Sequence, residues 1–486
     1  MSVESAQRAL VDTEFVMTID GRAATTSATA PVFNPATKEV VASVPVAGRD
    51  DLDRAVSAAQ EAFVGWSNTP LTERQAAVSA IGDLLEARAE EFMALLTTEQ
   101  GKPRPMAEWE VLGSVAWFRE IAQQSLPEEV LEDGPDRKVI TRHTPLGVVG
   151  AIVPWNFPIL LMVWKIAPAL VAGDTMIVKP SPFTPLCDLK LIELVQEVLP
   201  PGVLSALSGD DELGKWITSH PGISKIAFTG STDTGRHVMR SAAETLKRVT
   251  LELGGNDPAI VLPDVDPKKV ASQIFWAAFQ NNAQFCNAAK RIYIHDDVYE
   301  AVRDELVEFA KTVTVGNGAD SSTDLGPIQN EPQYHKVQEY FDDCAAQGYT
   351  FALGGHIDTD QDGWFVPVTL VDNPPENSRL VVEEPFGPIL PLLRWSDEDD
   401  VIRRANDTIW GLGATVWGAD LEAIERIGKQ LEAGTVWLNE VHQYSPHQVF
   451  GGHKQSGIGA ENSLHGLAEY TNHQTITINK TSGAVS

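Results

Sequence analysis

The chain has 486 residues, of which 67 are acidic and 37 basic, so its net charge at neutral pH is −30. Hydrophobic residues make up 43% of it and include 12 tryptophans and 17 phenylalanines, which is enough for large buried cores and excludes a disordered chain. Contacts to phosphate need clustered lysine and arginine, so the charge argues against nucleic acid or an anionic membrane as the main partner. At roughly 150 residues per domain, about three domains are expected.

The first 140 residues are predicted to be mostly helical. One helix is expected from Asp51, as its cap, to about residue 66, because apolar residues recur there on one face. A second is expected over residues 72–99, where a glycine and a proline follow.

From residue 139 onward, segments of strand and helix character alternate. Buried strands are expected at 148–153, 177–180, 225–230, 250–253 and 259–262, with helices at 160–171 and 186–198 and from 232. A second alternating block runs from residue 270 to about 438. Such alternation is typical of parallel α/β sheets, so two successive α/β domains with a cleft between them are predicted.

The tail, residues 473–479, alternates like an exposed strand. No segment within the chain is an evident pairing partner for it, so pairing with a partner subunit is one interpretation. The chain shows no internal repeat and no low-complexity segment.

The three cysteines are too few and too unevenly spaced to indicate a disulfide framework or a metal site: Cys187, Cys286 and Cys344. The N-terminal segment lacks a basic stretch followed by an apolar core, so a secretion signal is not expected. The most apolar stretch, residues 157–178, is interrupted by a lysine, a proline and an aspartate, which does not fit a membrane span. These features predict a reduced, cytoplasmic protein.

The turn from Gly230 to Gly235 follows an expected strand and opens an expected helix, where free N–H groups suit a pyrophosphate. It matches neither GxGxxG nor a P-loop, and a plain strand–helix turn explains it equally well. The turn Pro154–Pro158 carries Asn156 between prolines and aromatic residues. A rigidly held amide suits an oxyanion donor, although shaping a turn is the commoner role of asparagine.

Cys286 follows an expected helix in the segment FQNNAQFCN. A lone cysteine is more often inert and buried than nucleophilic, and only about 3% is thiolate at pH 7 when its pKa is unperturbed. Glu252 lies among apolar residues at a strand end, where burial would raise its pKa and make it a usable base. A salt-bridged glutamate is the alternative.

Taken together, six motifs have an order and spacing similar to those of the aldehyde dehydrogenase superfamily: VPWNFP, KPS, FTGST, LELGG, QFC and EEPFGP. The resemblance extends from NPATKE near the N-terminus to FGGHKQSG at 450–457. It implies a Rossmann-like cofactor domain, a catalytic domain and a small β oligomerisation element, in a homodimer or homotetramer. The implied ranges are 1–123 with 144–253, 254–450, and 124–143 with 465–486.

By this resemblance, Cys286 attacks the aldehyde carbon, and Asn156 with the backbone N–H of Cys286 holds the oxyanion. Hydride transfer to the nicotinamide leaves a thioester, which water activated by Glu252 hydrolyses. Family members that pass the acyl group to coenzyme A generally lack this carboxylate, so a free acid is expected. Glu461 and Lys165 match positions that help relay the proton, with a surface ion pair as the alternative.

The resemblance also implies a nicotinamide cofactor. Glu384 matches the residue that holds the nicotinamide ribose, with Phe386 packed beside it, and Lys179 matches a contact to the adenosine ribose. The other expected cofactor residues are Ile152, Trp155, Ser181, Pro182, Gly230, Ser231 and Gly235. Many NAD-specific relatives have an acidic residue where this chain has Pro182, and without it a 2′-phosphate is not repelled. Some NAD-using relatives also carry KPSP, so we expect NAD, with NADP tolerated.

A second departure is Ala283, where the family commonly has glycine; the added methyl disfavours positive φ and is expected to tighten the nicotinamide side of the cleft. The residues expected to line the substrate tunnel are aromatic or apolar: Phe157, Leu161, Trp164, Phe285 and Phe450. No arginine is evident to bind a second carboxylate, which favours apolar or aromatic aldehydes over semialdehyde acids. The loop 440–448 carries two histidines and a tyrosine, which either contact the substrate or are solvated.

Two alternatives remain. Cys286 can act as an esterase without a redox step, which fits a side activity best. The chain can also be a cofactor-binding scaffold with little turnover, but the presence of Cys286, Glu252 and Asn156 together argues against it.

Overall fold

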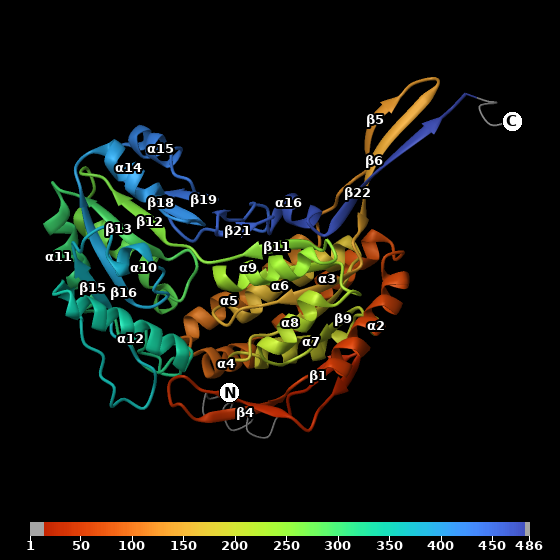
Figure 1. Cartoon of the computed structure of the whole chain (residues 1–486), viewed down its shortest axis with the longest axis horizontal. Helices are drawn as coiled ribbons and strands as arrows, with labels where there is room; N and C mark the ends of the chain where they lie inside the picture. Colours follow the sequence, from red (N-terminus) through yellow and green to blue (C-terminus); the bar gives the residue numbers. More distant parts are fainter. Residues whose placement is uncertain (1–13, 482–486) are drawn as a thin grey trace.

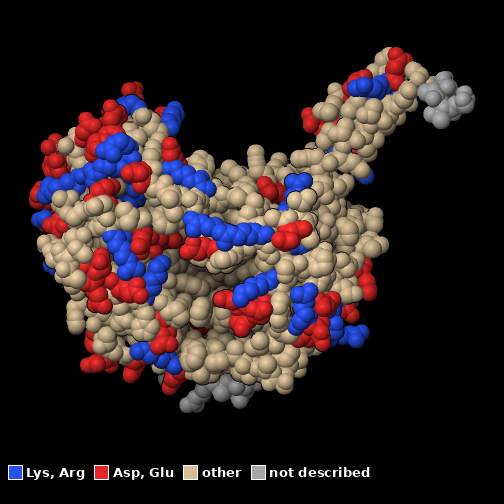
Figure 2. All heavy atoms as spheres, viewed as in Figure 1, with Lys and Arg blue, Asp and Glu red and all other residues tan. Residues whose placement is uncertain are grey.

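The structure is a computed structural model that describes residues 14–481. Two β-sheets, each with helices packed against it, form the body of the molecule, and a long three-stranded arm projects from one end (Figure 1). On the face drawn in Figure 2, acidic and basic side chains are interspersed, and a hollow lies between the two halves. Among residues 14–481, none of the helices combines the length and the hydrophobicity that a membrane span requires.

The first sheet has eight strands in the order β2-β1-β9-β8-β7-β10-β11-β21. Their bounds are Met17–Ile19 (β1), Arg22–Ala24 (β2), Val148–Ile152 (β7), Thr175–Lys179 (β8), Leu204–Ala206 (β9), Lys225–Thr229 (β10), Arg248–Glu252 (β11) and Gly457–Ile458 (β21). The five central strands, β9 to β11, are parallel and largely buried, which explains their apolar sequences. The strand order reverses between β7 and β10, where nucleotide-binding sheets of this kind place their ligand.

Eight helices are associated with this sheet: α2 (Arg49–Trp66), α3 (Leu71–Ala87), α4 (Ala89–Gln100), α5 (Arg104–Ile121), α6 (Pro158–Ala172), α7 (Leu186–Leu194), α8 (Asp211–Ser219) and α9 (Thr232–Ala243). The single helix expected over 72–99 is wrong, because the backbone at Arg88 leaves the helical region (φ −115°, ψ 16°) and separates α3 from α4. Asp51 is not the cap of α2 but lies inside its first turn. Its carboxylate accepts a hydrogen bond from the N–H of Gly48 at 2.8 Å and so secures the start of the helix.

The second sheet has seven strands in the order β14-β15-β16-β13-β12-β18-β19, all parallel to their neighbours except β14. They are β12 (Asp257–Val261), β13 (Ala289–His295), β14 (Thr350–Leu353), β15 (Thr369–Asp372), β16 (Ile389–Trp395), β18 (Gly413–Trp417) and β19 (Thr435–Leu438). The helices of this half are α10 (Pro267–Phe279), α11 (Tyr299–Ala310), α12 (Glu331–Ala346), α13 (Arg379–Val382), α14 (Glu398–Asn406) and α15 (Leu421–Gly428). The predicted class of two successive parallel α/β units is confirmed.

The smaller elements are β3 (Thr29–Phe33) with β4 (Val40–Pro45), β17 (Trp410–Gly411) with β20 (His453–Lys454), the 3₁₀ turns Val195–Glu197 and Gln280–Ala283, and α16 (Ser463–Ala468). The arm consists of β5 (Glu129–Asp133), β6 (Arg137–Pro145) and β22 (Thr471–Asn479). The tail therefore has a partner within its own chain, since β22 pairs with β6 along its whole length. Local sequence gives no sign of this pairing between segments more than 320 residues apart. Residues 1–13 and 482–486 of the expected domain ranges lie outside the described part of the chain.

Candidate active site

The carboxyl ends of four parallel strands bring several predicted residues to one edge of the first sheet. Ile152 ends β7 and lies opposite Lys179 of β8. Gly230 follows β10, and its N–H donates to the carbonyl oxygen of Glu252 at 3.0 Å. Because parallel strands end together, residues far apart in sequence meet at this edge.

The two glycines of the LELGG motif allow the two halves of the site to approach closely. A Cβ atom at Gly254 would overlap Oε2 of Glu384, and one at Gly255 would lie 2.8 Å from the carbonyl oxygen of Cys286. The N–H of Gly255 donates to Oε1 of Glu384 at 3.2 Å. The short link from β11 to β12 therefore holds Glu252, Cys286 and Glu384 in one region, which a bulkier link would separate.

Cys286 lies between the 3₁₀ turn Gln280–Ala283 and β13, at the amino end of the second sheet. Its thiol donates to Oδ1 of Asn287 at 3.3 Å. Burial raises the pKa of this thiol to about 12, against the opposing effect of the Lys290 ammonium. The cysteine is therefore a neutral thiol at neutral pH in this state, and deprotonation needs help from its surroundings.

The amide of Asn156 points to the same loop. Asn156 is 4% exposed, and its Nδ2 donates to the carbonyl oxygen of Gln284 at 3.0 Å. The backbone carbonyl oxygen of Asn156 accepts hydrogen bonds from Lys102 at 2.6 Å and from Asn281 at 3.2 Å. These hydrogen bonds fix the turn from two sides. The residue that the Asn156 amide contacts, Gln284, precedes Cys286 by two positions.

Glu252 is buried, and neither of its carboxylate oxygens has a hydrogen-bond partner within the described chain. Burial raises the pKa of Glu252 well above its usual range; Glu461 raises it further and Lys165 lowers it. Lys165 and Glu461 form an ion pair at 2.5 Å, with side chains only 0% and 2% exposed. A surface ion pair at these positions is therefore excluded, and both charges act on Glu252 in a poorly solvated environment.

A cavity joins the thiol to the expected tunnel. It is lined by the five predicted substrate residues, Phe157, Leu161, Trp164, Phe285 and Phe450, together with Cys286, Asn287, Glu252, Thr229, Leu253, Trp109, Leu160 and Tyr444. Trp109 and Leu160 were missed by the sequence analysis, because no motif marks them. Trp109 lies on α5 and meets the Phe157 ring edge-on, with centroids 6.1 Å apart.

The loop 440–448 divides between the interior and the surface. The half-buried ring of His442 packs 4.4 Å from that of Phe285, and desolvation lowers the pKa of His442 to about 4, so it is neutral at pH 7. Tyr444 lines the cavity, and its hydroxyl has no hydrogen-bond partner in the described structure. His447 is exposed and lies 3.0 Å from Glu120. Only the first two can influence a ligand in the cavity.

The expected cofactor residues include a buried cation suited to a polar ligand. Lys179 is 4% exposed, and its Nζ donates only to the adjacent carbonyl of Pro180, at 3.3 Å, among the residues the structure describes. Burial lowers its pKa to about 8, while Asp211 and Asp210 raise it. An ammonium group with so little compensation fits the ribose hydroxyls of a dinucleotide.

The other cofactor positions surround the same edge. Ser231 caps α9 by accepting from the N–H of Thr234 at 3.2 Å, and the helix begins directly after the end of β10. Trp155 meets Phe386 edge-on at 5.5 Å. Ser181 accepts from the N–H of Phe183 at 3.3 Å, and Pro182 follows directly. These residues fit a nucleotide that crosses the edge toward Glu384.

The glycines of the 230–235 turn have a packing role of their own. A Cβ at Gly230 or at Gly235 would lie 2.5 Å from the side chain of Phe228 or Leu253, respectively. The absence of side chains at these two glycines therefore lets α9 pack closely against the strands, and this packing role does not depend on a bound phosphate.

The chain matches the model of the aldehyde dehydrogenase family over residues 22–476. It is 40% identical to aldehyde dehydrogenase LUC3 of a Fusarium species, covering 92% of this chain and 95% of that protein. It is 37% identical to phenylacetaldehyde dehydrogenase of Pseudomonas fluorescens, covering 92% of each. The solved NAD⁺ complex of an aldehyde dehydrogenase from Bacillus cereus superposes with a TM-score of 0.95 at 35% identity, covering 98% of both chains. The chain therefore belongs to the aldehyde dehydrogenase family and is an NAD(P)-dependent enzyme that oxidises aldehydes.

Proposed function

We propose that this enzyme oxidises apolar or aromatic aldehydes to free carboxylic acids, with Cys286 as nucleophile, Asn156 as oxyanion donor and Glu252 as base. The observation that carries the proposal is the single cavity that joins the Cys286 thiol, the Glu252 carboxylate and a wall of aromatic side chains. A substrate lying along these rings would present its carbonyl carbon to sulfur and expose the resulting thioester to water beside Glu252.

In this mechanism the thiol gives its proton to solvent water, and the thiolate sulfur adds to the carbonyl carbon while the π electron pair moves to the carbonyl oxygen. The N–H groups of Asn156 and of the Cys286 backbone stabilise the oxyanion. A nicotinamide cofactor bound by the residues named below would supply the oxidising power for this step, as an acceptor of hydride. Glu252 then takes a proton from water, the hydroxyl adds to the thioester carbon, and the C–S bond breaks to release the acid and the thiolate. The buried Lys165–Glu461 pair leads the proton away from Glu252.

For the cofactor we propose that Lys179 holds the adenosine ribose, Ser231 and the start of α9 the pyrophosphate, and Glu384 the nicotinamide ribose. Trp155 and Phe386 would pack around the nicotinamide side, and Ile152, Ser181, Pro182, Gly230 and Gly235 would shape the floor. Asp210 and Asp211 place negative charge near Lys179, which favours NAD over NADP despite Pro182.

The proposed substrate class rests on the chemistry of the cavity wall. None of the residues that line the cavity is an arginine or a lysine, so a second carboxylate on the substrate would meet no positive partner. The named activity of the Pseudomonas fluorescens relative, on phenylacetaldehyde, is of the same chemical kind. The Tyr444 hydroxyl remains available for a polar substituent.

We further propose that the arm joins two copies of the chain, within a cytoplasmic dimer or tetramer. Every residue of β5 is exposed, including Val130 at 53% and Leu131 at 56%. Apolar side chains on a projecting edge strand favour contact with another copy. The proposed division into cofactor, catalytic and arm units follows the two sheets and the arm.

Cofactor reduction at 340 nm tests this function, with NAD and NADP in separate assays and short aliphatic, long aliphatic, aromatic and carboxylated aldehydes as substrates. We expect the highest kcat/KM with aromatic or long aliphatic aldehydes and NAD, and no turnover in Cys286→Ala. A preference for carboxylated aldehydes would contradict the substrate class. Hydrolysis of an aryl ester without any cofactor reduction would favour the esterase alternative. The absence of both reactions would indicate a cofactor-binding scaffold.

A further inference from the structure

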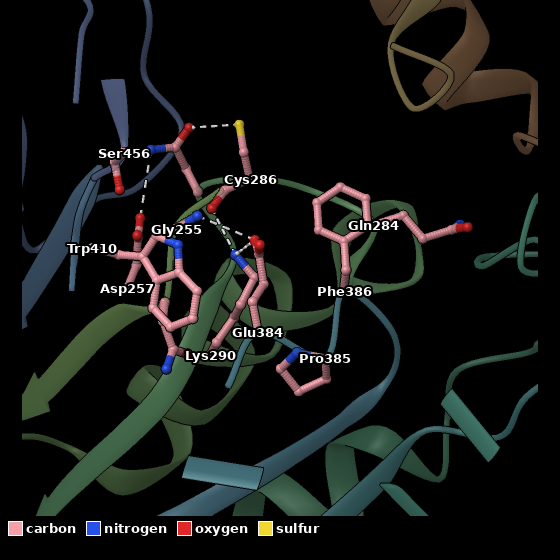
Figure 3. Close-up of polar contacts among 12 residues, drawn as sticks. Gly255, Asp257, Gln284, Cys286, Lys290, Glu384, Pro385, Phe386, Trp410 and Ser456 are labelled. Carbon is pink, nitrogen blue, oxygen red and sulfur yellow. Dashed lines mark hydrogen bonds and ion pairs between the residues drawn. The ribbon is translucent and has the colours of Figure 1, made fainter. Parts of the chain in front are cut away.

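Lys290, the second residue of β13, is a buried cation directly behind the nucleophile. Its side chain is 1% exposed. Nζ donates to the carbonyl oxygen of Cys286 at 2.6 Å and lies 3.2 Å from Oε1 of Glu384 (Figure 3). One ammonium group therefore touches both the backbone of the nucleophile and the side chain to which we assign the nicotinamide ribose.

The sulfur and this ammonium lie on opposite sides of the cysteine. In Figure 3 the thiol of Cys286 points away from Lys290, whose Nζ meets the carbonyl. The charge of Lys290 therefore acts on the sulfur through space, in a region from which solvent is largely excluded. It also fixes the peptide that carries the sulfur, because the carbonyl of Cys286 is held at hydrogen-bond distance.

Three carboxylates oppose the effect of Lys290 on the thiol. Lys290 lowers the pKa of Cys286, whereas Asp257, Glu384 and Glu252 raise it. Lys290 is thus the one cation among these four neighbours, and Glu384 partly neutralises it. Its removal would leave the sulfur among three carboxylates and desolvated, where a thiolate is least stable.

We propose that Lys290 is a positioning residue of this active site: its ammonium holds the Cys286 peptide in place and provides the positive charge that stabilises the thiolate, and Glu384 controls how much of that charge the sulfur experiences. The role of Glu384 toward ribose rests on the proposed function, but the action of Lys290 on the thiol does not. When Glu384 binds a ligand instead of Lys290, the sulfur experiences more positive charge and ionises more readily.

Alkylation of the cofactor-free protein by iodoacetamide tests this role without any need for turnover. Cys187 and Cys344 are fully buried, so Cys286 is the thiol that reacts, and Cys286→Ser gives the background. Loss of one neighbouring opposite charge shifts a pKa by about one unit or more. We therefore expect Lys290→Met to alkylate about three- to tenfold more slowly at pH 8, allowing for the higher nucleophilicity of the more basic thiolate. Lys290→Arg keeps the charge and should restore most of the rate.

Lys225→Met is the matched control, because Lys225 is a fully buried lysine of the first sheet that contacts Thr250. The alkylation rate of Cys286 in Lys225→Met should equal the rate in the protein without substitutions. Glu384→Gln tests the proposal in the opposite direction and should accelerate alkylation. An unchanged rate in folded Lys290→Met overturns the proposal. If that variant does not fold, Glu384→Gln decides, and an unchanged or slower rate overturns it. Failure of the dehydrogenase assay alone would overturn the proposed function and not this inference.

Discussion

The side chain of Lys102 donates from Nζ to the backbone carbonyl oxygen of Asn156 at 2.6 Å, across 54 positions of sequence. The same ammonium pairs with Glu110, and both side chains are fully buried. The other carboxylate oxygen of Glu110 accepts from the N–H groups of Ile159 and Leu160 at the start of α6. The ion pair therefore connects helix α5 to the turn that orients the proposed oxyanion donor.

We expect Lys102→Met to destabilise the fold by about 3–5 kcal/mol, because it leaves the Glu110 carboxylate buried without a partner. Urea unfolding measures this loss. The double variant Lys102→Met/Glu110→Gln removes both charges and should recover much of the stability, but its kcat should remain low because the Asn156 carbonyl still lacks its donor. Full recovery of kcat in the double variant would contradict a role for Lys102 in orienting Asn156.

Replacement of Glu252 should stop the reaction after cofactor reduction. In Glu252→Gln we expect a burst of one reduced cofactor per active site, followed by turnover slower by about 10²–10⁴-fold, because no base activates water. Stopped-flow absorbance at 340 nm separates the two phases. Rapid steady turnover without a burst would refute this assignment.

The pH dependence of the native enzyme follows from the same residue. Burial raises the pKa of Glu252 well above its usual range, and the carboxylate is the active form. Deacylation should therefore quicken as pH rises through that pKa, and slow as the group protonates at lower pH. Glu252→Gln should lose this rise. A pH profile of kcat identical in both proteins would show that another group limits the step.

Asp211 should contribute to cofactor choice. It lies at the start of α8 and, with Asp210, places negative charge near Lys179. A solvent-exposed charge pair amounts to about 1 kcal/mol at most, so Asp211→Asn should raise the NADP-to-NAD ratio of kcat/KM by up to about fivefold. Glu212→Gln is the matched control, since Glu212 pairs with Lys215 at 3.2 Å and should leave the ratio unchanged. Equal ratios in all three proteins would assign cofactor choice to another residue.

Ala283 lies in a strained backbone beside the nucleophile. The residues Asn281, Asn282 and Ala283 all have positive φ, at 52°, 59° and 57°. The left-handed conformation costs a residue with a side chain about 1–2 kcal/mol, whereas glycine adopts it freely. Ala283→Gly should therefore stabilise the protein by about 0.5–1 kcal/mol after the greater chain entropy of glycine is subtracted. Ala289→Gly, in β13, should instead destabilise it; a loss of unfolding free energy in both variants would rule out strain at position 283.

Local patterns in the sequence determined much of the fold. Buried parallel strands have continuous apolar sequences because both faces of the sheet are covered, so β7, β8, β10 and β11 could be located within a few residues. Turns rich in glycine and proline marked the strand ends, and with them the motifs that carry Asn156 and Glu252. The break at Arg88 was missed, because no glycine or proline signals it.

Contacts between distant segments were decided only by the tertiary structure. The sequence of β22 does not specify β6 as its partner, since polar alternating strands pair with many others. Lys165 and Glu461 have the residue types of a surface pair, and only the packing of α6 against the C-terminal segment buries them. Likewise, Lys290 meets Cys286 and Glu384 because two loops and a strand start converge at one point. Side-chain chemistry is encoded locally, but its surrounding charge and burial depend on how the two sheets dock.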